Sequence, residues 1–131
     1  LDLDATLQEA EAADIDQWWD GQTFDRILLD VPCTGTGTWR RSPDLRRRTT
    51  PEALAEVQTH QRAILESAAR LVKPDGRLIY ATCSIMPEEN EQQVEAFLNA
   101  HESFKRIDED LRLYPHTHGT DGFYGAVLQK A

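Results

Sequence analysis

Two short apolar runs most constrain what this chain can fold into. "FDRILLD" (24–30) and "RLIYATCS" (77–84) are bounded by turn-forming residues and have the length and composition of buried strands. Between them, apolar residues recur at helical spacing from Leu54 to Val72, after the N-cap and proline pair Thr50-Pro51. A strand, a long helix and a second strand predict a right-handed crossover and an α/β fold.

The remaining segments extend this pattern into one domain, because the chain has only 131 residues. The segments between the two strands and beyond them contain no internal repeat. We expect a modest helix over 4–19, a loop over 31–49, a turn over 73–76, a helix opened by Pro87, a short strand over 103–109, a loop over 114–122 and a final strand over 123–130.

Composition favours an intracellular protein. Two cysteines are too few for a disulfide-built secreted domain, so both thiols are expected to be free in a reducing setting. No apolar run approaches the roughly 18 residues of a membrane span. The acidic N-terminal stretch "LDLDATLQEAEAAD" lacks a signal-peptide pattern. We therefore expect a soluble, cytoplasmic protein without a membrane partner.

One basic segment interrupts an acidic chain. Residues 40–48, "RRSPDLRRR", carry a net charge of +4 in a chain whose total is −9. Such a loop suits local contact with an anion better than wrapping of a long duplex. Charge runs are usually solvated, but an aromatic residue beside arginines is typical of RNA contact, through base stacking and phosphate binding. The expected RNA-binding residues are Trp39, Arg40, Arg41, Arg46, Arg47 and Arg48.

Both predicted strands carry reactive residues at their carboxyl ends, where α/β sheets bind ligands. Asp30, Pro32 and Cys33 follow the first strand, and Cys83 ends the second. Each cysteine has four alternative roles: a small buried packing residue, one half of a redox pair, a metal ligand or a nucleophile. The redox and metal alternatives lack their usual spacing, although the chain has His60, His101, His116 and His118.

The glycines that follow Cys33 suggest a phosphate loop at first sight. Gly35 and Gly37 are not followed by Gly-Lys-Ser/Thr, and Arg40 stands where a dinucleotide fingerprint needs its third glycine. We therefore interpret these glycines as residues that allow a sharp turn.

These motifs together resemble the Sun family of RNA cytosine-5 methyltransferases, which includes bacterial small-subunit ribosomal RNA enzymes. The resemblance rests on "DRILLDVPCTGTG", "YATCSIMPEENEQQVEAFL" and "DGFYGAVL", and it runs from about residue 24 to the end. It implies the C-terminal half of a Rossmann-like, S-adenosylmethionine-dependent methyltransferase fold, with a mostly parallel sheet and an antiparallel last strand. The implied reaction is methylation of cytidine C5 in RNA, with ribosomal RNA as the expected substrate.

The resemblance also implies roles for individual residues. Cys83 would add to C6 of the cytosine, and Cys33 would assist release of the methylated product. Asp30 would contact the N3/N4 edge of a base that has left its stack, and would help in acid–base catalysis. The cofactor S-adenosylmethionine would lie near Asp30, Pro32 and Asp4. No metal is expected.

In the family, a glycine-rich cofactor loop and further strands precede the segment that corresponds to residue 1. We therefore expect residues 1–131 to be a partial catalytic domain that is inactive alone and that self-associates through an exposed strand 24–30. Two alternatives are a non-catalytic RNA-binding module of the same fold and a DNA cytosine-5 methyltransferase, in which the Pro-Cys cysteine would be the nucleophile.

Overall fold

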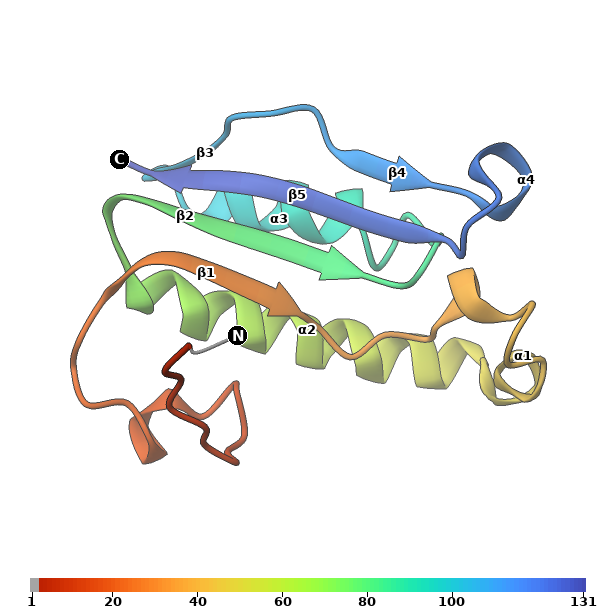
Figure 1. Ribbon diagram of the computed structural model, residues 1–131, viewed down its shortest axis with the longest axis horizontal. Coiled ribbons are helices and arrows are strands. Elements are labelled where there is room, and N and C mark those ends of the chain that lie inside the picture. Colours follow the sequence, from red (N-terminus) through yellow and green to blue (C-terminus); the bar gives the residue numbers. More distant parts are fainter. Residues whose placement is uncertain (1–2) are drawn as a thin grey trace.

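The computed structural model describes residues 3–131 as a sheet covered by helices (Figure 1). Strands β1 and β2 are parallel and are joined by the long helix α2, while β5 lies antiparallel to β2. This arrangement confirms the α/β class and the antiparallel last strand. The strand order is β1 (Phe24–Asp30), β2 (Val72–Thr82), β5 (Phe123–Lys130) and β3 (Phe104–Arg106), with β4 (Leu111–Leu113) also paired to β5.

Helix α2 (Pro51–Leu71) begins where the sequence predicts. The Thr50 hydroxyl accepts a hydrogen bond from the Ala53 amide at 3.1 Å, and Pro51 occupies the first turn. The helix packs beside α3 (Glu91–Ala100) and against the sheet. Alternate residues of β2 and β5 face these helices, so the core forms between one face of the sheet and the two helices. Its buried members include Ile64, Leu65, Ala68, Leu78, Tyr80, Val94, Phe97, Tyr124, Ala126 and Leu128.

The other face of the sheet is more open among the described residues. In β1, Ile27 and Leu29 pack against the core, whereas Leu28 between them is 67% exposed. Leu111 of β4 is also exposed. Strand β1 is an edge strand here, since β2 is its only partner in the described sheet.

The predicted helix over 4–19 is wrong. Only the 3-10 turn η1 (Ile15–Gln17) forms there. Leu7 is 92% exposed, so no apolar stripe supports a helix. The Trp18 and Trp19 indole N–H groups donate to the Glu11 and Gln22 carbonyls instead, and these local bonds fix an irregular chain.

Other boundaries differ in smaller ways. The predicted turn over 73–76 lies within β2, where the pairing jumps from Phe24↔Val72 to Arg26↔Arg77 and Asp75 has a φ of 63°. Of the strand expected over 103–109, only Phe104–Arg106 (β3) forms. The loops contain the short helices η2 (Thr36–Thr38), α1 (Asp44–Arg48) and α4 (Pro115–His118), and β4 is an element without a sequence prediction.

Within residues 3–131, no helix is both long and apolar enough to cross a membrane. The carboxyl ends of β1 and β2 point toward the edge where α1 and α4 lie (Figure 1). Most of the sequence-predicted site residues lie on the loops at this edge.

Candidate active site

The two cysteines, fifty positions apart, meet at the carboxyl ends of β1 and β2. Asp30 pairs in register with Ala81, and the Val31 amide donates to the Ala81 carbonyl at 3.1 Å, so the two strands end level. The Sγ atoms of Cys33 and Cys83 are 3.3 Å apart, and both cysteines are free thiols that are partly buried. The predicted convergence of both cysteines at one edge is confirmed.

The two thiols are chemically unequal. Either sulfur can donate the hydrogen bond between them, and with Cys33 as the donor it lowers the pKa of Cys83 to about 7 although partial burial opposes this shift. The same hydrogen bond, together with burial, raises the pKa of Cys33 far above its ordinary value. At neutral pH the pair therefore favours a Cys83 thiolate beside a protonated Cys33.

No helix N-terminus of the described residues lies at Cys83 to stabilise its thiolate. Helix α3 begins only at Glu91, eight residues further along the chain, and a turn separates it from the cysteine. The neighbouring thiol replaces the helix as the group that stabilises the thiolate.

Asp30 lies at the tip of β1 with an exposed side chain. It is close enough to Cys83 that its negative charge raises the pKa of that thiol. Within residues 3–131 no hydrogen bond or ion pair engages its carboxylate, which leaves it available to a ligand. Pro32 is also exposed, and its carbonyl accepts a hydrogen bond from Gln61 at 2.9 Å.

Glu89 is a functional candidate that the sequence pattern does not reveal. In the sequence it is one of three acids that follow Pro87, and acids near a helix start usually lie in solvent beside the helix dipole. Its side chain is instead fully buried behind the cysteines, where it accepts hydrogen bonds from Thr34 and Ser84. A buried acid and a solvated one look alike in a single sequence.

A second set of contacts fixes the turn that carries Cys83. The Thr82 hydroxyl donates to Asn90 at 2.6 Å, and the Asn90 amide donates to the Ser84 carbonyl at 2.8 Å. The Ser84 amide donates back to the Thr82 hydroxyl at 3.1 Å. The side chains of Thr82, Ser84 and Asn90 are all buried, so this turn is held rigidly.

The two glycines after Cys33 serve a close approach between backbones. The Gly37 amide donates to the Cys83 carbonyl at 3.0 Å, and the Gly122 amide donates to the Gly37 carbonyl at 2.7 Å. A Cβ atom on Gly37 would collide with both the Gly122 and Cys83 carbonyl oxygens. Gly35 adopts a left-handed conformation with φ 70°. The glycines thus bring three loops together, in agreement with the turn interpretation.

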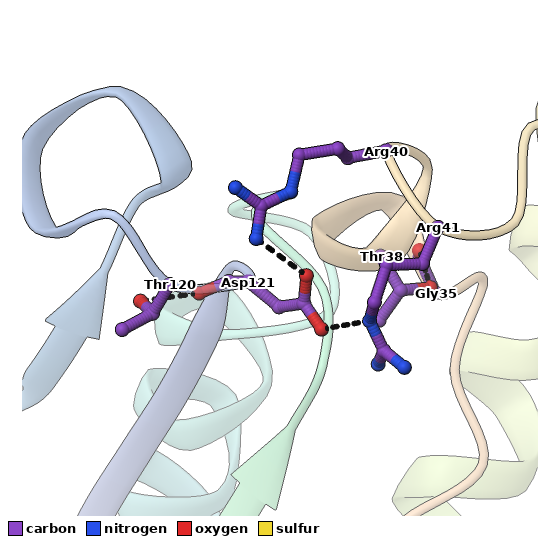
Figure 2. Close-up of polar contacts among 6 residues, drawn as sticks. All are labelled: Gly35, Thr38, Arg40, Arg41, Thr120 and Asp121. Atoms are coloured by element: carbon purple, nitrogen blue, oxygen red, sulfur yellow. Dashed lines mark hydrogen bonds and ion pairs between the residues drawn. The ribbon is translucent and has the colours of Figure 1, made fainter.

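Two of the predicted RNA-binding arginines are anchored to the body of the protein. Figure 2 shows Arg40 and Arg41 converging on Asp121. A terminal guanidinium nitrogen of Arg40 lies 3.5 Å from Asp121 Oδ1, and Nε of Arg41 lies 2.5 Å from Oδ2. Asp121 is 9% exposed, whereas both arginines remain more than half exposed. The ion pairs fix their direction and leave other guanidinium N–H groups facing solvent.

The other predicted ligand residues are more scattered. Arg46, Arg47 and Arg48 lie exposed on α1 at the same edge, and Arg48 pairs weakly with Asp44 at 3.8 Å. Trp39 is half-buried. Asp4 is exposed on the irregular N-terminal segment, and within residues 3–131 no hydrogen bond or ion pair joins it to the loops that carry Cys33 and Cys83. In residues 3–131 no three His, Cys, Asp or Glu side chains are grouped so that they could hold a metal ion.

Comparison with known proteins identifies the family. A family model described as 16S rRNA methyltransferase RsmB/F matches residues 1–129. Ribosomal RNA small subunit methyltransferase B of Shewanella oneidensis is 45% identical over 144 aligned residues, which cover 100% of this chain and 33% of that protein. The protein of the same name from Vibrio cholerae is also 45% identical, over 99% of this chain and 31% of its own length. The chain thus spans about a third of the curated relatives it matches.

Solved structures agree with this assignment. The crystal structure of NSun6 from Pyrococcus horikoshii with SFG superimposes with a TM-score of 0.82 at 30% identity, over 95% of this chain and 34% of that one. A methyltransferase homologue from the same organism gives a TM-score of 0.83 at 29% identity, over 98% of this chain and 46% of its own. The fold described above is therefore part of a Rossmann-like, S-adenosylmethionine-dependent methyltransferase. The chain belongs to the RsmB/F family of 16S rRNA methyltransferases.

Proposed function

We propose that the complete enzyme containing this chain methylates C5 of a cytidine in ribosomal RNA through a covalent bond between Cys83 and C6. The observation that carries this proposal is the thiol pair. Cys83 is 3.3 Å from Cys33 and has a pKa of about 7, while its partner stays protonated. The names of the curated relatives support ribosomal RNA as the substrate class.

C5 of cytosine is a weak nucleophile, so the chemistry needs covalent activation. The Cys83 thiolate adds to C6, the electron pair of the C5–C6 double bond shifts toward the ring carbonyl and N3, and C5 gains enamine character. S-adenosylmethionine, when bound, supplies the methyl group. Asp30, whose carboxylate is free at the tip of β1, is suited to hold the N3/N4 edge during this addition.

For product release, the C5 proton is transferred to solvent water and its electron pair re-forms the C5–C6 double bond. The Cys83–C6 bond breaks in the same step, and its electron pair returns to sulfur. Cys33 is the neighbouring group that assists this elimination, because its sulfur lies within hydrogen-bond distance of the Cys83 sulfur. Asp30 and Pro32, exposed at the strand end, are the residues of this chain that would hold the cofactor. Asp4, on the separate N-terminal segment, would be a further residue that contacts the cofactor.

Two substitutions in the complete enzyme test these roles. Cys83→Ala should abolish methylation, because no thiolate remains to add to C6. Cys33→Ala should accumulate a covalent protein–RNA adduct, visible as a shifted band on a denaturing gel. The double variant is the matched control and should form no adduct. Activity retained by Cys83→Ala, together with no adduct from Cys33→Ala, would contradict the assignment; a preference for DNA over RNA would contradict the substrate.

The isolated chain is proposed to bind S-adenosylmethionine weakly or not at all and to be inactive. This proposal is supported by its coverage, since relatives that carry the named activity are about three times as long. Titration calorimetry on residues 1–131 measures this directly. Micromolar affinity would overturn the proposal.

A further inference from the structure

We propose that Glu89 is a positioning residue, whose buried carboxylate holds the two cysteine loops together so that Cys33 and Cys83 stay in contact. This inference rests on the proposed function, in which the two thiols act on one base. Glu89 does not touch the reacting atoms. It lies behind them, on the turn between Cys83 and helix α3.

The carboxylate receives a donor from the residue that follows each cysteine. The Thr34 amide donates to Glu89 Oε1 at 2.8 Å, and the Thr34 hydroxyl donates to Oε2 at 2.6 Å. The Ser84 hydroxyl donates to the same Oε2 at 2.5 Å. One side chain therefore joins the loop after β1 to the loop after β2.

Helix α2 completes the coordination of this carboxylate. Gln61 donates its side-chain amide to Glu89 Oε1 at 3.1 Å and also to the Pro32 carbonyl at 2.9 Å. Residues on both sides of Cys33 are thus tied to Glu89 or to its partner. The backbone carbonyl of Glu89 also accepts a hydrogen bond from the Tyr80 hydroxyl at 2.6 Å, which ties the turn to strand β2.

The directions of the hydrogen bonds are determined by counting protons. The Thr36 hydroxyl oxygen accepts from the Ile85 amide, and the Ser84 hydroxyl oxygen accepts from the Met86 amide. Since the Ser84 proton goes to Glu89, the Thr36 hydroxyl must donate to Ser84, at 3.0 Å. Each hydroxyl proton in this series of hydrogen bonds then points toward the carboxylate, which suits an acceptor with about four lone-pair sites.

An isolated buried carboxylate would be costly, and no cation pairs with Glu89 among the described residues. Four donors satisfy its oxygens, and hydrogen bonds to an ionised group are the stronger kind. The network is therefore strong where it is complete and sensitive to the loss of a single member. This is the behaviour expected of a residue that fixes geometry.

The alternative is that Glu89 acts on Cys83 through its charge alone. The two possibilities predict opposite shifts in the pKa of Cys83 when Glu89 is replaced. The negative charge of Glu89 raises the pKa of Cys83, as does that of Asp30, whereas the hydrogen bond from Cys33 lowers it. Removal of the charge alone should therefore lower the pKa of Cys83. Separation of the loops should raise it toward the ordinary thiol value, because the Cys33 hydrogen bond is lost.

The test measures the pH dependence of iodoacetamide alkylation at Cys83 in the complete enzyme, with the labelled peptide quantified by mass spectrometry. Glu89→Ala should shift the midpoint upward and slow alkylation at pH 7 by about tenfold or more. Glu91→Gln, which removes a charge at the start of helix α3 just after the turn that carries Glu89, is the matched control and should leave the midpoint unchanged. An unchanged or lowered midpoint in Glu89→Ala overturns the proposal.

A second variant keeps the test valid if Glu89→Ala does not fold. Thr34→Val removes one hydroxyl donor and retains the shape, the backbone amide and the charge of Glu89. It should raise the midpoint by a smaller amount, and an unchanged midpoint would contradict the proposal that Glu89 holds the two cysteine loops together. Alkylation needs no RNA and no methyl transfer, so its result stands even where the adduct experiment on Cys33→Ala refutes the proposed function. In methylation assays Glu89→Ala should lower kcat while KM for RNA stays unchanged.

Discussion

At the scale of single residues, the main property of this protein is the inequality of two neighbouring thiols. Cys33 and Cys83 occupy equivalent places at the ends of parallel strands. One sulfur donates the hydrogen bond and the other accepts it, so one thiol holds its proton more tightly and the other loses it more easily. The roles of attacking and assisting group follow from that difference.

The first prediction concerns pH. Cys33→Ala removes the donor that stabilises the Cys83 thiolate, so the pKa of Cys83 should rise above 7. Asp30→Asn removes a negative charge that raises this pKa, so it should fall. Alkylation of Cys83 followed from pH 5 to pH 10 checks both signs through its midpoint. At pH 7 a rise of one pKa unit should slow the rate about fivefold, whereas a fall can speed it by less than about twofold. Shifts in the same direction for both variants would show that the thiols do not interact as described.

At the scale of elements, the loop from Gly35 to Arg48 combines anchored and free arginines. Arg41 is directed by Asp121, which is almost buried, while Arg46 and Arg47 extend from α1 into solvent. A run of arginines that looks uniform in the sequence thus contains some that are anchored by ion pairs and others that are free in solvent.

The second prediction separates these members. Arg46→Ala should weaken RNA binding and reduce the slope of affinity against salt by about one, without a change in thermal stability. Arg41→Ala should weaken binding and also lower the melting temperature, because Asp121 loses its closest partner. Affinity measured over a salt series, with melting curves in parallel, distinguishes the two. Equal stability loss in both variants would contradict the division.

Some of the elements could be predicted from the sequence, and others could not. Strands β1 and β2, helix α2 and the meeting of Cys33 with Cys83 follow from apolar periodicity and strand direction, which are local signals. The helix over 4–19 fails because its acidic, weakly periodic sequence has little to bury. The Glu89 cluster and the Asp121 ion pairs join residues 5 to 81 positions apart, and no local pattern records such partners.

At the scale of the whole molecule, the sheet is incompletely covered. Strand β1 has β2 as its partner on one side, and Phe24 and Leu28 are 44% and 67% exposed. An unpaired apolar edge favours pairing with another chain.

The third prediction follows from that edge. Residues 1–131 should self-associate as concentration rises, and Leu28→Lys should reduce the association without affecting the melting temperature of the monomer. Sedimentation velocity over a concentration series measures both. A monomer at every concentration would rule out association through β1.

The contact between Gly37 and Gly122 also determines when the active edge can form. The Gly37 amide bonds to the Cys83 carbonyl, and its own carbonyl accepts the Gly122 amide, so the loops of three distant segments close as one unit. During synthesis, the two cysteine loops can meet once β2 has formed, but the third loop arrives only with β5. Because β5 follows both cysteine loops in the sequence, this edge is completed only after β5 has been made and has joined the sheet. A nascent chain therefore carries its reactive thiols in an unfinished setting until β5 is in place.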